Sequence, residues 1–310
     1  MAEFLIKDED LASLKGKVVV LTGGSSGIGL ATVTLLLSLG ASVVSGDLNA
    51  PTDSPSAPAF TFVKTNVASW SDLRSLFKTA HENHGRIDYV FANAGIGPRA
   101  DYLSLATNEA GELQEPSHEL IDVSLNGVIN TATLGVHYMK TQAGGGNIVL
   151  MGSSTGLQPL RAPDYSTAKH GVLGFGRGLA RLLDAASIPV RVNTLMPSWT
   201  TTSVVPSMDI IMPAISQPSQ APLVVARAAV YFMATKDRQG EAVYVADGKY
   251  TEIEKAVLFP AYEKIKGEGN KTDDQVLENI LAFAAAAAAA ETAKAAAPAA
   301  PAVASPTAGQ

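Results

Sequence analysis

Cysteine is absent from the 310-residue chain. The chain therefore cannot form disulfides, thiolate metal sites or cysteine nucleophiles. Long hydrophobic runs are lacking too, since the seven alanines at residues 284–290 are too short and too weakly hydrophobic a run to span a bilayer. Residues 1–15 are charged and contain none of the apolar core that a secretory signal needs. These absences predict a soluble, cytoplasmic protein that does not act at a membrane.

Positive charge is also scarce, because 23 lysines and arginines face 29 acids and leave a net charge of −6. Such a chain lacks the basic surface that binding to a phosphate backbone requires, so nucleic acid is not an expected partner. The five histidines show no ligand spacing with acids, and we predict no metal site. The chain does have 46% hydrophobic residues against 17% charged ones, which is typical of a globular protein.

Short β-branched apolar runs alternate with helical patterns over most of the chain. A run that is apolar at every position suits a strand buried on both faces, and repeated alternation indicates a parallel sheet. The predicted strands are residues 17–22, 41–45, 60–64, 87–92, 147–151, 190–195 and 242–245. The predicted helices are residues 28–39, 71–82, 117–140, 165–185 and 222–234. We predict an α/β fold in one domain, with a doubly wound parallel sheet of about seven strands and helices on both faces.

Three segments fall outside this alternation: a Pro/Ser/Ala-rich loop at residues 49–58, residues 198–221 and the C-terminal tail. Residues 198–221 are long and rich in Ser, Thr and Pro, and we interpret them as a lid or binding loop over the substrate. Residue propensity favours a helix over residues 273–290. The Ala/Pro-rich end has too little apolar bulk to pack, which predicts disorder. In order, the expected parts are a lead at 1–14, the domain at 15–250, an extension at 251–283 and the tail at 284–310.

A glycine-rich turn, TGGSSGIG at residues 22–29, joins the first predicted strand to the first predicted helix. Glycines let the backbone turn tightly and approach a pyrophosphate, while the helix N-terminus offers free N–H donors. A strand before the turn and a helix after it make this a specific signal for a dinucleotide. The residues expected to contact the cofactor here are Gly23, Ser25, Ser26, Gly27, Ile28 and Gly29.

Asp47 closes the second predicted strand, twenty residues after Gly27. A carboxylate in this position accepts hydrogen bonds from the adenosine ribose hydroxyls and repels a 2′-phosphate. The glycine turn also contains no arginine or lysine that could pair with a 2′-phosphate. The sequence therefore favours NAD over NADP as the cofactor.

Tyr165 and Lys169 are separated by one helical turn, so the phenol and the ammonium lie on the same helix face. Interconverting an alcohol and a ketone by hydride transfer also requires a proton to move at the oxygen. A phenol has an ordinary pKa of about 10, and a nearby ammonium lowers it toward the working range. We predict Tyr165 as the acid/base group, with Lys169 tuning it and holding the nicotinamide ribose.

The TGxxxGxG spacing resembles the short-chain dehydrogenase/reductase family, and the resemblance runs from about residue 15 to about residue 249. It implies a Rossmann-type fold, a nicotinamide cofactor and a homodimer or homotetramer. The family's Asn-Ala-Gly motif matches Asn93, Ala94 and Gly95. Its adenine-contacting position matches Asn66, where the family has an acid, followed by Val67. Its nicotinamide-contacting offsets match Thr200 and Thr202, which follow Ser198 where the family has a glycine.

The resemblance also supplies the other two members of the catalytic set. The family's oxygen-binding serine lies three residues before a glycine, which selects Ser153, although the spacing to Tyr165 is twelve residues and not the usual thirteen. Ser154 is the alternative. Ser124 stands where the family has an asparagine whose carbonyl anchors a water in a proton relay to the lysine, and serine keeps that carbonyl. Asn126 points about 200° away around the helix and is not expected to substitute.

The sequence thus predicts an NAD(P)-dependent oxidoreductase that interconverts a secondary alcohol and a ketone on an apolar small molecule. It resembles fungal family members related to 15-hydroxyprostaglandin dehydrogenase, several of which act in secondary metabolism. The alternative is a protein of this fold that binds the cofactor without redox turnover, as a sensor, a scaffold or a non-redox catalyst. The short Ser153–Tyr165 spacing, Ser124 and Ser198 motivate this alternative.

Overall fold

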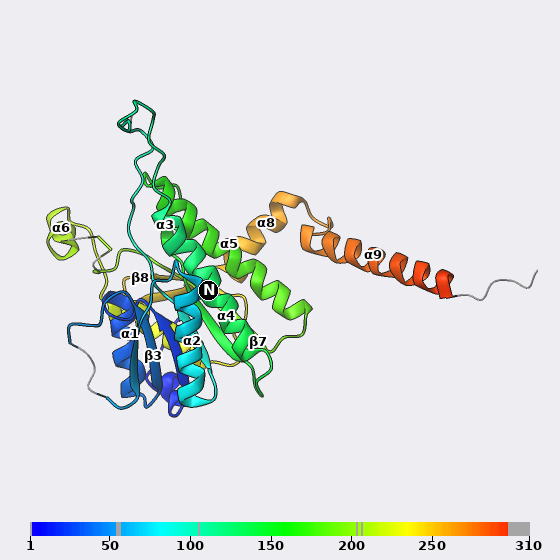
Figure 1. The fold of residues 1–310 in the computed structure, drawn as a ribbon, viewed down its shortest axis with the longest axis horizontal. Coiled ribbons are helices and arrows are strands. Elements are labelled where there is room, and N and C mark those ends of the chain that lie inside the picture. The colour runs from blue at the N-terminus through cyan, green and yellow to red at the C-terminus, as the bar shows by residue number, and fades with distance from the viewer. Residues whose placement is uncertain (1, 54–56, 105, 203, 206, 297–310) are drawn as a thin grey trace, which may run out of the picture. The chain divides into compact units, whose positions relative to one another are not determined.

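The apolar runs form one nine-stranded sheet in the computed structural model, which describes residues 2–53, 57–104, 106–202, 204–205 and 207–296. The chain divides into two units, Met1–Val257 and Leu258–Gln310, and the sheet belongs to the first. Figure 1 shows the strands at the centre of this unit with helices packed around them. The Rossmann-type α/β fold is therefore confirmed.

All seven predicted strands are present and parallel, in the spatial order β8-β7-β6-β5-β2-β3-β4. They are β2 (Val18–Thr22), β3 (Ser42–Asp47), β4 (Phe60–Lys64), β5 (Tyr89–Ala92), β6 (Gly146–Met151), β7 (Val190–Pro197) and β8 (Ala242–Ala246). Two short antiparallel strands were not predicted: β9 (Lys249–Glu252) pairs with β8, and β1 (Glu3–Phe4) pairs with β9. β1 has two residues and β9 has the polar sequence KYTE, so neither shows the continuous apolar run that identifies the parallel strands. The lead at residues 1–14 and residues 251–252 therefore contribute to the sheet unit.

Two apolar layers cover the sheet, because alternate side chains of each strand point to opposite faces. In β2, Val19 and Leu21 pack beneath α1 (Gly27–Ser38), α7 (Pro222–Ala234) and η1 (Glu9–Leu14). Val20 packs on the other face beneath α2 (Trp70–His84), α4 (Gly127–Met139) and α5 (Pro163–Ala185). Burial on both faces explains why these strands read as continuous apolar runs.

The helix predicted over residues 117–140 is divided. It consists of α3 (Glu119–Ile121), a π-helical turn η2 (Asp122–Asn126) and α4. Ser124 in the π turn is fully buried, and its hydroxyl accepts a hydrogen bond from the backbone N–H of Ile96 at 3.0 Å. Such single π turns occur frequently at functional sites. The other four predicted helices match α1, α2, α5 and α7 to within two residues at each end.

The segment predicted as a loop at residues 198–221 contains a short helix, α6 (Met208–Ala214). Met208 and Met212 lie one turn apart on this helix, and both are buried. A Ser/Thr/Pro-rich composition hides this helix from sequence patterns, because it is stabilised by the burial of two side chains against the rest of the unit. A one-turn helix η3 (Ser154–Gly156) precedes α5.

The second unit contains α8 (Phe259–Lys266) and α9 (Asp273–Ala296), and η4 (Glu254–Leu258) leads into it. The helix predicted from residue 273 is thus longer than expected and includes residues 284–296 of the Ala/Pro-rich segment. Disorder is predicted for residues 284–310. Of these, residues 284–296 belong to α9, and residues 297–310 lie outside the described residues. None of the helices within the described ranges is both long and apolar enough to cross a membrane.

Candidate active site

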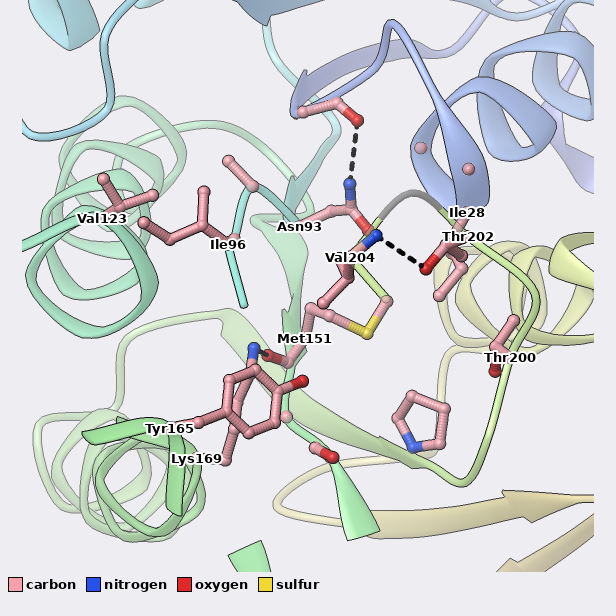
Figure 2. Close-up of a pocket in the computed structure, with 18 of the residues that line it drawn as sticks. Ile28, Asn93, Ile96, Val123, Met151, Tyr165, Lys169, Thr200, Thr202 and Val204 are labelled. Carbon is pink, nitrogen blue, oxygen red and sulfur yellow. Dashed lines mark hydrogen bonds between the residues drawn. The ribbon is translucent and has the colours of Figure 1, made fainter. Parts of the chain in front are cut away.

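A cavity of about 810 Å³ opens at the carboxyl ends of β2, β5, β6 and β7. The strand order reverses between β2 and β5, and open α/β sheets bind ligands at such a point. Figure 2 shows Tyr165 and Lys169 on one side of this cavity, with Thr200 and Thr202 on the other. Nearly all the site residues predicted from the sequence line it, and Ser25 and Ser124 are the two that do not.

The glycine turn lies between β2 and α1, and it leaves no room for a side chain at Gly23 or Gly29. Gly23 has a positive φ of 72°, and a Cβ at Gly29 would lie 1.9 Å from the Gly23 carbonyl oxygen. Only glycine fits at residue 29, because that distance is far below van der Waals contact. The Ser26 side chain does not cap α1, so the first N–H groups of the helix are free to bind an anion.

The Asp47 carboxylate stands beside this turn at the end of β3. Its two oxygens accept hydrogen bonds from the backbone N–H groups of Ser25 at 3.0 Å and Leu48 at 2.7 Å. Asn66 and Val67 also line the cavity; Asn66 accepts a hydrogen bond from the backbone of Ala68 and leaves its NH₂ group free of partners among the described residues. This end of the cavity therefore offers a carboxylate and an amide donor, as a ribose and an adenine require.

Asn93 joins the ends of β2 and β5. Its side-chain NH₂ donates to the carbonyl oxygens of Thr22 and Gly23, at 3.1 and 3.0 Å. The Thr22 hydroxyl accepts in return from the backbone N–H groups of Asn93 and Ala94. Asn93 thus contributes to the cofactor site by fixing the glycine turn against the β5 loop.

Tyr165 and Lys169 project from the first turns of α5 into the cavity. The Lys169 ammonium donates a hydrogen bond to the Met151 carbonyl oxygen at 3.0 Å and lies 5.6 Å from the centre of the Tyr165 ring. Only 3% of Lys169 is exposed. The phenol and the ammonium therefore lie close together, as predicted, and the Met151 carbonyl holds the amine at the end of β6.

Burial controls the protonation of both groups. Desolvation lowers the pKa of Lys169 from 10.5 to about 8. Burial also raises the pKa of Tyr165 above its ordinary value, against the opposing effect of a hydrogen bond with the Ser153 hydroxyl. In the free protein the pKa of Tyr165 thus moves opposite to the lowering that the sequence predicts, because the desolvation of the phenolate outweighs the effect of the Ser153 hydroxyl.

Ser153 is the serine whose hydroxyl acts to lower the pKa of Tyr165. Ser153 lies at the end of β6 as the N-cap of η3, where its hydroxyl accepts a hydrogen bond from the Thr155 backbone N–H at 3.2 Å. Ser153 and Tyr165 both line the cavity, where both hydroxyls could meet one substrate oxygen. Ser154 also lines the cavity.

Ser124 lies behind the cavity wall, next to Lys169. A Cβ at Gly95 would lie 3.4 Å from the Ser124 hydroxyl oxygen and 3.7 Å from the Lys169 nitrogen, so the two polar groups approach the same glycine. Asn126 is exposed and bonds to Asp122 at 3.1 Å, as its place on the helix predicts. Ser124 therefore holds the β5 loop through Ile96 and does not face the substrate.

Thr200 and Thr202 line the cavity at the base of the 198–221 segment. The Thr200 hydroxyl donates to the Ser198 carbonyl oxygen and accepts from the Gln220 side chain, at 2.9 and 3.3 Å. Gln220 also donates to the Val245 carbonyl oxygen. Gln220 is a buried residue that sequence patterns do not single out, and it anchors the far end of the segment beside Thr200.

Asp164 is a second buried residue that sequence reasoning misses. Its carboxylate accepts hydrogen bonds from three backbone N–H groups, those of Arg99 at 2.8 Å, Ala100 at 3.1 Å and Tyr165 at 2.8 Å. An acid after Pro163 at a helix start is a visible sequence signal, but its burial depends on the distant β5 loop. Asp164 therefore connects that loop to the helix bearing Tyr165.

These residues fit a nicotinamide dinucleotide. The cradle between Gly23 and Gly29 that a Cβ would fill, the uncapped start of α1 and the Asp47 carboxylate could hold its pyrophosphate and adenosine ribose. Lys169 and Thr200 could hold the nicotinamide half. Within the described ranges, no group of three or more His, Cys, Asp and Glu residues is placed to bind a metal ion.

Comparison with known proteins agrees with this geometry. A family model described as short chain dehydrogenase matches residues 17–209. The short-chain dehydrogenase/reductase ascJ of Acremonium egyptiacum is 49% identical over 286 residues, covering 91% of this chain and 96% of that protein. The 15-hydroxyprostaglandin dehydrogenase of Homo sapiens, whose name specifies NAD(+), is 31% identical over 208 residues, covering 63% of this chain and 73% of that protein.

A solved structure extends the comparison. The NADPH-dependent 3-quinuclidinone reductase from Rhodotorula rubra matches with a TM-score of 0.64 and 25% sequence identity, covering 77% of this chain and 92% of that chain. The resemblance noted from the sequence is thus confirmed.

The glycine cradle yields a first prediction. Gly29→Ala places a methyl group against the Gly23 carbonyl, which must displace the turn. We expect the dissociation constants of NADH and NADPH to rise at least about ten-fold, measured by fluorescence titration. Gly178→Ala on α5 is the matched control, since a Cβ there meets nothing within 4 Å. Unchanged binding in Gly29→Ala would contradict a cofactor seated on this turn.

Lys169 yields a second prediction, on stability. Its pKa is 10.5 when unfolded and about 8 when folded, so between these values the unfolded chain binds more protons and stability rises with pH. Below about pH 8 the full cost of burying the ammonium applies, on the order of 3 kcal/mol from the size of the shift. Lys169→Met removes this cost together with a hydrogen bond of about 1 kcal/mol.

We therefore expect Lys169→Met to unfold at higher denaturant concentration than the parent at pH 7. The difference between the two unfolding midpoints should shrink as the pH rises toward 10.5. Denaturant titrations at both pH values measure it. Lys78→Met is the control, because Lys78 is exposed on α2 and its substitution should have an effect that does not vary over this window. A Lys169→Met protein less stable than the parent at pH 7 would contradict the desolvated amine.

Proposed function

The chain belongs to the short-chain dehydrogenase/reductase family, and on that premise we propose that it interconverts a secondary alcohol and a ketone on an apolar small molecule with NAD. The observation that carries this proposal is the meeting of the Tyr165 phenol, the Ser153 hydroxyl and the buried Lys169 amine at the cavity. These are the groups needed to bind an oxygen and to move a proton at it.

Each residue has a defined part in the reaction. The nicotinamide, when bound, supplies or accepts the hydride. The Ser153 hydroxyl holds the substrate oxygen by a hydrogen bond, and Tyr165 donates a proton to that oxygen in reduction or removes one in oxidation. Lys169 is charged below about pH 8 and favours the phenolate over the phenol by its charge.

The walls of the cavity support an apolar substrate. Ile96, Val123, Met151 and Leu160 line it, and Figure 2 shows Ile96 and Val123 on one side of the space into which Tyr165 points. Trp199 also lines it while 52% exposed, so a flat, apolar group could stack on its ring at the entrance. An apolar body bearing one oxygen near Tyr165 fits this lining.

Charge at the adenine end supports NAD. Asp47 would repel a 2′-phosphate, and among the described residues lining the cavity Lys169 is the sole lysine or arginine. The family as a whole uses either nicotinamide cofactor, and the relatives include one named for NAD(+) and one titled NADPH-dependent. The relative at 49% identity comes from Acremonium egyptiacum, and we retain the prediction of a reaction in fungal secondary metabolism. We retain the prediction of a homodimer or homotetramer in the cytoplasm.

The cofactor assignment predicts that NADH binds at least ten-fold more tightly than NADPH, a difference of about 1.4 kcal/mol. Asp47→Asn removes the charge and keeps one oxygen that can accept a hydrogen bond from the turn. The difference between the NADH and NADPH affinities should therefore narrow, mainly because NADPH binds more tightly. Calorimetric titration with both cofactors measures it. Asp53→Asn is the control, because that exposed acid lies outside the cavity lining. Equal affinities in the parent protein would refute the proposed preference.

The assignment of Tyr165 as proton donor predicts that Tyr165→Phe loses at least about 10²-fold in turnover, because the substitution keeps the ring and removes the acid/base oxygen. Cofactor oxidation measured by absorbance with a panel of ketones tests this. Tyr138→Phe removes a hydroxyl from a ring packed on α4 outside the site and should keep the parent's activity. A Tyr165→Phe protein with full turnover would refute Tyr165 as the proton donor, whereas a parent protein that oxidises the cofactor with none of the ketones would favour cofactor binding without redox turnover.

A further inference from the structure

Asp164 is a buried carboxylate beside this cleft, and the proposed reaction does not use it. It is the second residue of α5, directly after Pro163 and directly before Tyr165. Its exposed fraction is 1%, and its three hydrogen-bond partners are all backbone N–H groups. A buried carboxylate costs stability unless its charge is satisfied, so these donors must compensate its desolvation.

The donors do satisfy it. Burial acts to raise the pKa of Asp164, but the hydrogen bonds from Arg99, Ala100 and Tyr165 together hold that pKa below its ordinary value. The start of α5 adds a favourable dipole. The Arg99 guanidinium turns elsewhere, toward Glu119 and the Gly97 carbonyl. The role of Asp164 is therefore to hold backbone, since no cationic side chain is paired with it among the described residues.

The backbone that Asp164 holds is a wall of the cavity. Residues 93–100 follow β5, and Ile96 and Pro98 within them line the cavity. Ser124 fixes this segment at Ile96, and Asp164 fixes it at Arg99 and Ala100. Beyond residue 100 the chain continues into an arm that projects from the sheet unit before returning at α3, as Figure 1 shows.

The other oxygen of the same carboxylate binds the Tyr165 N–H. One side chain therefore spans from the backbone of the proposed proton donor to the backbone of the opposing wall. A carboxylate has a fixed distance between its two oxygens, so it sets the separation between Tyr165 and this wall. Without it, the backbone from Pro98 to Ala100 would lose both hydrogen bonds to α5, and the remaining restraints would be the Ser124 bond at Ile96 and the exposed ion pair of the Arg99 side chain with Glu119.

We propose that Asp164 is a specificity-determining positioning residue, whose carboxylate sets the width of the substrate end of the cavity by tying residues 99 and 100 to the start of the Tyr165 helix. This inference rests on the proposed function, in which the substrate lies between Tyr165 and Ile96. It assigns to Asp164 an effect on which substrates fit, with no contact to the reacting atoms.

The test measures binding of two ketones to the protein–NAD⁺ complex, where no hydride is available and turnover cannot occur. Cyclohexanone and 2-decalone share the ketone and differ by one ring. In Asp164→Asn the side-chain NH₂ group replaces one of the two accepting oxygens and faces N–H donors. The hydrogen bonds on that side of the carboxylate are therefore lost. We expect the ratio of the two dissociation constants to change at least five-fold by calorimetry, with NAD⁺ affinity within two-fold of the parent.

Two further variants make the result specific. Asp164→Glu keeps the charge and adds one methylene, so it should also shift the ratio, and it remains informative if Asp164→Asn does not fold. Asp101→Asn is the matched control, because that exposed carboxylate also accepts a backbone N–H, from Leu103, but holds no cavity wall. Its ratio should equal the parent's. Hydrogen exchange should quicken at residues 96–100 in Asp164→Asn and stay unchanged at residues 22–29.

An unchanged ketone ratio in folded Asp164 variants would overturn the proposal, as would failure of both ketones to bind the parent complex. Because binding is measured without turnover, these outcomes are separate from those of Tyr165→Phe. A parent protein that binds the ketones selectively but never reduces them would refute the proposed reaction while leaving the role of Asp164 supported.

Discussion

The hydrogen bonds between Asn93 and the end of β2 join the two halves of the sheet where its strand order reverses. The glycine turn depends on them, because the Asn93 amide occupies the carbonyls of Thr22 and Gly23 on which that turn begins. The cavity wall depends on them too, since residues 94–100 extend from the same asparagine. Asn93 thus fixes the glycine turn relative to the β5 loop, from which the cavity wall continues.

The polar groups of the cleft are placed at a cost in stability. Lys169 is an ammonium with 3% exposure, and Asp164 is a carboxylate with 1% exposure that pairs with no cationic side chain in the part of the chain that the structure describes. Removing such groups from water is unfavourable, and the two apolar layers on the faces of the sheet offset that cost. Sites that must hold charge away from water commonly show this trade between stability and activity.

The sequence predicts what depends on local pattern. Continuous β-branched runs predict the seven parallel strands, and the glycines with Tyr165 and Lys169 predict the position of the cleft. It does not predict features set by distant contacts. The π turn at Ser124 depends on Ile96, α6 depends on burying Met208 and Met212, and the role of Asp164 depends on amides about 65 residues away. The pKa of Tyr165 is raised where the sequence predicts a lowering, because burial raises it and burial is a property of the folded structure alone.

The partners of Asp164 are peptide groups, and every residue except proline carries an N–H. The side chains at residues 96–100 can therefore be exchanged during evolution without breaking the tie that holds their backbone. A lineage could alter the chemistry of this wall one substitution at a time while the scaffold and the proton donor stay fixed. Residues 96–100 can therefore vary with the substrate, whereas Asp164 and Tyr165 are expected to stay unchanged.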